Sequence, residues 1–108
     1  MKVSELAATE GFRALALSDP SRQIKGCYVG DLLSWVMGRA QADNAWITIM
    51  SNVNVAAVAS LADVACVIFA EGVQPDEQAT AAAQLRGLNL IATELPEYEA
   101  AVALSRLI

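Results

Sequence analysis

The sequence predicts a three-layer α/β/α sandwich with a mostly parallel central sheet, folded as a single domain over residues 1–108. From Ala45 onward, strand and helix signals alternate with short connections, which is typical of parallel strands joined by right-handed helical crossovers. The strand segments in this part of the chain are apolar at most positions, as expected for strands covered on both faces. A chain of 108 residues suits one domain rather than two.

The first part of the chain predicts a short helix, two extended segments and a second helix. Ser4 is a candidate N-cap for the first helix. Residues 12–17 alternate loosely and predict a strand, and residues 18–21 are turn formers. Residues 23–29 predict a second extended segment. Asp31 follows as the expected cap of the next helix.

The second part predicts three strands, each followed by a helix. The strands are expected at residues 45–50, 64–70 and 88–93, and the middle one carries no charge. Pro75 and Asp76 open the helix after the middle strand, and Pro96 opens the last helix. Helical spacing gives the expected buried faces as Leu32, Leu33, Val36 and Ala40, then Val55, Val58, Ala59 and Ala62, and finally Ala101, Leu104, Leu107 and Ile108.

Composition narrows the class of protein. Hydrophobic residues make up 56% of the chain and charged residues 18%, which excludes disorder as its overall state. The apolar share is high for a small monomer, so we expect a homodimer. Twelve acidic and seven scattered basic residues argue against nucleic acid as a partner. Neither a signal peptide nor a membrane span is indicated, and we expect a cytoplasmic protein.

The residue types needed for several kinds of catalysis are missing. The chain contains no histidine, which excludes Ser-His-Asp and Cys-His arrangements and histidine-bound zinc. No glycine-rich dinucleotide or Walker motif is present. Two cysteines, Cys27 and Cys66, indicate a reducing compartment rather than a disulfide framework. We therefore expect no catalytic residues, no cofactor and no metal site.

One segment stands out as a candidate ligand site. Gly26 and Gly30 bracket a tight transition from a strand to a helix, and the backbone N–H groups near Asp31 could bind an anion. Tyr28, between the glycines, could stack on a nucleotide base or plug the pocket. The alternative is that the glycines only permit the turn and that Asp31 caps its own helix, which would occupy those N–H groups.

Two further residues are expected near this site. Asn52 and Glu71 follow two of the predicted parallel strands, and ligands of such sheets gather at the carboxyl ends of the strands. The alternative is that Asn52 caps a helix and Glu71 is solvated. The complete candidate site comprises Gly26, Tyr28, Gly30, Asp31, Asn52 and Glu71.

Trp35 and Met37 widen the apolar arc of the helix that follows Asp31. An arc wider than one core contact indicates either a subunit contact or ordinary core packing.

The sequence resembles the DRTGG domain family. The resemblance rests on the run from Arg22 to Ser34, on residues 45–61, and on residues 71–76. It implies a fold similar to the N-terminal domain of bacterial HPr kinase/phosphorylase, without that enzyme's catalytic domain. Related domains are found within phosphotransacetylases and beside CBS domains in regulated pyrophosphatases, and stand-alone copies are typical of bacteria and archaea. The resemblance thus implies a regulatory role.

The chain departs from the family pattern at one point, because Lys25-Gly26-Cys27 stands where the family has Thr-Gly-Gly. Together, the residues and the resemblance predict a non-catalytic regulatory module that senses a small anionic metabolite or a nucleotide as a homodimer. The alternative is a docking subunit that modulates a partner kinase or redox enzyme.

Overall fold

A five-stranded sheet forms the centre of the protein in the computed structural model, which describes all 108 residues. The strand order is β1-β5-β4-β3-β2. The four strands β2 to β5 run parallel to their neighbours, and β1 pairs antiparallel with β5. The bounds are β1 Phe12–Leu17, β2 Cys27–Val29, β3 Ala45–Thr48, β4 Cys66–Phe69 and β5 Asn89–Thr93.

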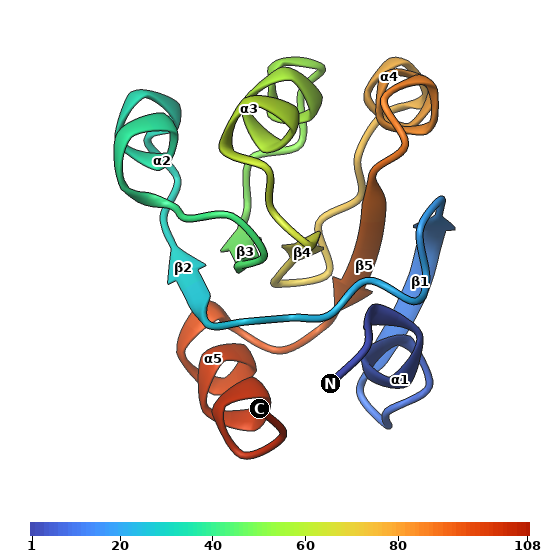
Figure 1. Cartoon of the computed structure of the whole chain (residues 1–108), viewed down its shortest axis with the longest axis vertical. Coiled ribbons are helices and arrows are strands. Elements are labelled where there is room, and N and C mark those ends of the chain that lie inside the picture. The colour runs from blue at the N-terminus through green and yellow to red at the C-terminus, as the bar shows by residue number, and fades with distance from the viewer.

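Five helices cover both faces of the sheet. They are α1 Val3–Ala7, α2 Leu33–Arg39, α3 Asn54–Ala62, α4 Glu77–Leu85 and α5 Glu97–Ser105. Helices α2, α3 and α4 lie on one face, and α1 and α5 lie on the other (Figure 1). The three helices share a face because each makes the same right-handed crossover between neighbouring parallel strands. The three-layer prediction is therefore confirmed. No helix is both long and apolar enough to cross a lipid bilayer.

The alternation of side chains along the strands divides the core into two halves. Trp46 and Val67 point toward α2, α3 and α4, and both are completely buried. Ile47 and Ile68, one residue further along each strand, are also completely buried and pack on the side of α1 and α5. This double coverage explains why β3 and β4 read as continuous apolar runs.

Several expected details of the helices are wrong. Helix α1 begins at Val3 rather than after Ser4, because Val3 is buried in the core and Lys2 pairs with Gln23 in an isolated bridge. Leu32 is 57% exposed because it precedes α2 and lies outside the buried stripe. The buried face of α5 stops at Leu104, since the helix ends at Ser105 and the last two residues of the chain are exposed.

The extended segment expected at residues 23–29 is mostly irregular. Only Cys27–Val29 forms a ladder with β3. Gly26 has a φ of +80°, a left-handed conformation that ends the regular strand at its amino side. As a result, β2 is a short strand at the edge of the sheet.

Candidate functional site

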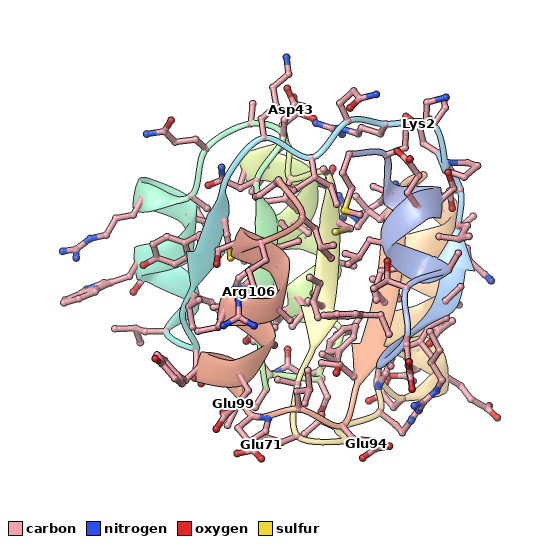
Figure 2. The ribbon with its side chains drawn as sticks, turned by 90° about the horizontal axis from the view of Figure 1, so that it is seen from below. Lys2, Asp43, Glu71, Glu94, Glu99 and Arg106 are labelled. Carbon is pink, nitrogen blue, oxygen red and sulfur yellow. The ribbon has the colours of Figure 1, made fainter.

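The carboxyl ends of the four parallel strands meet at one edge of the sheet. This edge carries the segments that follow β2, β3, β4 and β5. Glu71 and Glu94 lie on this side of the molecule, whereas Lys2 and Asp43 lie on the opposite side (Figure 2). No enclosed pocket is present at this edge.

Asp31 ties the end of β2 to the end of β3. Its Oδ1 accepts hydrogen bonds from the Thr48 hydroxyl at 2.8 Å and from the Ile49 backbone N–H at 2.9 Å. Thr48 is completely buried, so the carboxylate satisfies a donor that has no access to water. The expectation that Asp31 caps α2 is wrong, because Leu32 occupies the N-cap position and no side chain caps this helix.

The turn between β2 and α2 consequently keeps unpaired backbone donors. The N–H groups of residues 31–34 have no acceptor within the protein. If Asp31 capped its own helix, its carboxylate would accept hydrogen bonds from these donors. The carboxylate instead accepts hydrogen bonds from β3 and the residue after it. Unpaired backbone N–H groups carry partial positive charge and hydrogen-bond anions well.

Tyr28 and Trp46 hold the start of this turn in place. The indole Nε1 of Trp46 donates to the Gly30 carbonyl at 2.9 Å. The ring of half-buried Tyr28 lies against Gly30, where a Cβ atom would come within 2.8 Å of Cε2 of the ring. Gly30 therefore allows the Tyr28 ring to pack against the backbone, where any larger residue would clash with the ring. Its own N–H donates to Ile47, so this glycine offers no free donor.

Asn52 lies just before α3, where it can stabilise the start of the helix and also contact a ligand. Its Oδ1 accepts a hydrogen bond from the Asn54 backbone N–H at 2.9 Å, an Asx turn that precedes the helix, whereas Val53 occupies the N-cap position. The side-chain amide nitrogen has no partner in the protein. Asn52 thus stabilises the helix start and still offers two N–H donors to a ligand.

Glu71 and Gly72 form a tight turn after β4. Both residues have left-handed backbone conformations, with φ of +60° and +71°. Their N–H groups donate to the carbonyls of Leu95 and Thr93, which ties the ends of β4 and β5 together. The Glu71 side chain is exposed, in agreement with the solvated alternative.

Glu97, the first residue of α5, is a member of this edge that the sequence analysis did not single out. Its Oε2 is buried and has no hydrogen-bond partner. Desolvation, the charge of Asp31, a side-chain hydrogen bond with Asp31 and the charge of Glu71 together raise the pKa of Glu97 to about 7. The only signal in the sequence is an acidic residue directly after Pro96 and the last strand, which is common in a first helical turn.

Gly26 does not share the edge with the other five candidate residues. It precedes β2, whereas Gly30 and Asp31 follow it. Gly26 lies beside Asn44, whose side chain donates to the Lys25 carbonyl at 2.8 Å. Residues 45–47 of β3 pair with the whole of β2, so the two glycines lie at opposite ends of the sheet.

Arg22 organises that opposite end. Its guanidinium donates to Oδ1 of Asp43 at 3.0 Å and to Oδ1 of Asp63 at 2.9 Å. Both aspartates have left-handed backbone conformations, with φ of +68° and +58°. Arg22, which begins the run that resembles the DRTGG family, therefore fixes the loops that contain Asp43 and Asp63 at the amino ends of the strands.

Neither cysteine has the properties of a nucleophile. Although Cys27 is an exposed residue overall, desolvation raises the pKa of its thiol to about 11. Cys66 is buried in the core, and burial raises the pKa of its thiol to about 12. Both thiols are protonated at neutral pH, and a protonated thiol is a poor nucleophile.

Comparison with known proteins finds a likeness in fold. No family model and no curated protein matches the chain. The structure is similar to that of the CBS and DRTGG domains of the regulatory region of Clostridium perfringens pyrophosphatase, with a TM-score of 0.74 and 14% sequence identity. The match covers 94% of this chain and 44% of that one, which was solved in complex with an activator, diadenosine tetraphosphate. The likeness confirms a DRTGG-domain-like fold.

Proposed function

We propose that this protein is a non-catalytic regulatory module that binds a small anionic metabolite or a nucleotide and acts as a homodimer. The observation that carries the proposal is the set of unpaired N–H groups at residues 31–34, at the carboxyl end of a parallel sheet. Ligands of open α/β sheets gather at this end. The solved structure with the similar fold is a regulatory region in complex with a nucleotide activator, which supports the same class of function.

The proposed site consists of the turn after β2 and the start of α3. Backbone N–H groups of residues 31–34 would bind phosphate or carboxylate oxygens, and the side-chain amide of Asn52 would add a donor. Tyr28 lies against Gly30 beside this turn and would contact a base. Asp31 and Glu71 form the acidic border of the site, so the ligand would place its hydroxyl or amino groups there.

The chemistry of the edge supports binding rather than catalysis. The Oδ1 atom of Asp31 is committed to two structural hydrogen bonds with β3 and the residue after it. The thiols are protonated. The pKa of Glu97 is raised to about 7 beside Asp31, but the chain has no histidine and both thiols are protonated, so no activated nucleophile accompanies this carboxyl group.

A thermal-shift titration tests the proposal. Diadenosine tetraphosphate, ATP, GTP and inorganic phosphate would be added to the purified protein. A ligand at 100 times its Kd stabilises a protein by about 2.7 kcal/mol, or roughly 12 °C for a domain of this size. The proposal predicts such a shift with at least one nucleotide. A flat response to all four probes up to 5 mM, on the order of 100 times a 50 µM Kd, would contradict the nucleotide part of it.

Asn52→Asp is the sharpest variant for this site. The aspartate keeps the oxygen that accepts from Asn54 but removes the amide donor and adds a negative charge. The variant is expected to be as stable as the wild type without ligand and to lose at least tenfold in affinity. Asn54→Asp, a matched change two residues away, should retain most of the affinity, because its side chain makes no hydrogen bond at the turn.

A specific surface favours docking to another protein as the second candidate. Leu32, Trp35 and Met37 are 57%, 52% and 52% exposed and lie within six residues of one another around α2, where the Arg39 guanidinium covers one face of the Trp35 ring. If docking is the function, Trp35→Ala should abolish capture of a defined kinase or redox-enzyme partner and leave the nucleotide response unchanged.

A further inference from the structure

The β2 edge of the sheet offers backbone groups for pairing. In the ladder with β3, the Gly26 carbonyl accepts from Ala45, and the Gly30 N–H donates to Ile47. Because alternate residues of a parallel strand face the same neighbour, Tyr28 also faces β3. Cys27 and Val29 therefore direct their N–H and C=O groups away from the sheet. No other strand lies beyond β2 (Figure 1).

The opposite edge of the sheet is protected. Strand β1 contains a register shift between Ala14 and Ala16, a bulge that interrupts regular pairing. Exposed Arg13 adds a charge on the same strand and forms an ion pair with Glu94 at 3.5 Å. Bulges and charges are the devices by which proteins prevent edge-to-edge association. Strand β2 is only three residues long, which limits the ladder it can form, but it has neither a bulge nor a charge within Cys27–Val29, so the two edges differ in their capacity to pair.

The residues around β2 form a pattern that is symmetric about Tyr28. The order is Lys25, Gly26, Cys27, Tyr28, Val29, Gly30, Asp31. When two copies of this segment run antiparallel with Tyr28 at the centre, each Cys27 lies opposite Val29 of the partner. Each Gly26 lies opposite Gly30 of the partner, which leaves room for the tyrosine ring over Gly30. Each Lys25 lies opposite Asp31 of the partner, so opposite charges flank the ladder on both sides.

We propose that two copies of this chain pair through antiparallel β2 strands, with a two-fold axis at Tyr28 that joins their sheets into one. This rests on the homodimer in the proposed function and names its interface. The outward groups of Cys27 and Val29 form hydrogen-bonded pairs across the axis. The partner's Lys25 lies near Asp31 and the turn at residues 31–34, where it supplies a cation to an anionic ligand.

The apolar surface beside this edge fits the same arrangement. Helix α2 lies directly over the β2 edge at the end of its layer (Figure 1), and its only helical neighbour there is α3. Three large apolar side chains around it are more than half exposed: Leu32, Trp35 and Met37. Val29 itself is 44% exposed. In the proposed dimer the two α2 helices lie on the same side of the joined sheet, next to each other across the two-fold axis. Each α2 helix therefore covers part of the apolar surface of the other copy.

Disulfide trapping tests the register directly. In the proposed pairing, residues 27 and 29 of opposite copies have Cα atoms about 5.5 Å apart, which suits a disulfide. The variant Val29→Cys should therefore form a covalent dimer with the native Cys27 under diamide at pH 9 over several hours, conditions that allow for the raised pKa of the Cys27 thiol, seen on a non-reducing gel. Wild-type protein should not, because two Cys27 residues are diagonal neighbours about 7–8 Å apart.

Two matched controls accompany this variant. Cys27→Ser/Val29→Cys retains the new cysteine but removes its partner, and it should stay monomeric on the gel. Leu17→Cys places a cysteine at a similarly exposed position on the other edge strand, β1, and should not link to Cys27. All variants are checked by circular dichroism, and light scattering of the wild type measures its mass in solution.

The outcomes separate this interface from the homodimer itself. A covalent dimer for Val29→Cys alone supports the β2 pairing. If the wild type is a dimer in light scattering but Val29→Cys does not cross-link, the dimer uses another surface and the β2 pairing is wrong. A wild-type monomer at several hundred micromolar overturns both the interface and the homodimer.

Charge reversal gives a second readout that does not depend on cysteine chemistry. Lys25 is exposed, so Lys25→Glu should fold normally. The variant places like charges opposite each other twice in the dimer, and its dimer dissociation constant should rise roughly tenfold in low salt, with a smaller change at high salt. An unchanged dissociation constant in low salt would contradict the register centred on Tyr28.

Discussion

Asp31 should stabilise the protein through its hydrogen bonds rather than through its charge. Replacement by alanine removes the acceptor for two donors, the buried Thr48 hydroxyl and the Ile49 N–H. Leaving a donor without its acceptor costs about 1–3 kcal/mol, and a value of about 1.5 kcal/mol for each donor applies because Asp31 is half-buried. We therefore expect Asp31→Ala to lower the free energy of unfolding by about 3 kcal/mol.

The expected change in melting temperature follows from the size of the protein. Unfolding entropy is about 2.1 cal/mol/K per residue, or about 0.23 kcal/mol/K for 108 residues. A loss of 3 kcal/mol then lowers Tm by about 13 °C. Asp31→Asn is the matched control, because its Oδ1 can accept both hydrogen bonds, and it should cost less than about 1 kcal/mol.

Urea unfolding followed by circular dichroism measures both variants. If Asp31→Asn destabilises the protein as much as Asp31→Ala, the charge matters and the hydrogen-bond argument is refuted. A loss below about 1 kcal/mol for Asp31→Ala would refute it as well, because the two donors would then be satisfied in another way.

Three further predictions follow from the same contacts. The raised pKa of Glu97 means that folding favours its neutral form, so its contribution to stability is complete below pH 4.5 and is lost as the pH rises through about 7. Glu97→Gln should therefore be more stable relative to the wild type at pH 8 than at pH 5 in urea unfolding, and an equal difference at both pH values would refute the assignment. Trp46→Phe should cost about 3 kcal/mol, because it leaves a gap in the core and the Gly30 carbonyl without its donor, whereas a cost below about 1 kcal/mol would contradict this. Arg22→Gln should cost about 1–3 kcal/mol by leaving two aspartates without their cation, and thermal unfolding with no change in Tm would show that the ion pairs contribute nothing.

The layers and the parallel strands could be predicted because each depends on local patterns. Strand β4 is an apolar run without charge, and α4 has its cap in Asp76, whose Oδ1 accepts from Ala79 at 2.7 Å. These features are visible within a few residues of sequence. The similarity in fold at 14% identity shows that such patterns persist when most residues differ.

The candidate site could be predicted only in part, because its contacts join distant segments. Asp31 reads as a helix cap from its neighbours, but its partner Thr48 lies 17 residues away. Gly26 and Gly30 look like one motif, yet the strand between them separates the two ends of the sheet. The environment of Glu97 depends on Asp31, 66 residues earlier in the chain, and only the fold brings them together.

The proposed ligand site at the turn after β2 is tested most directly by a two-dimensional NMR titration of ¹⁵N-labelled protein with diadenosine tetraphosphate and ATP. We predict that the backbone amide signals of residues 31–34 and the side-chain amide of Asn52 shift with saturation. Signals at the opposite end of the sheet, near Arg22 and Asp43, should remain in place. If no signal shifts at millimolar nucleotide, or if the shifts gather around Arg22, the proposed site is contradicted.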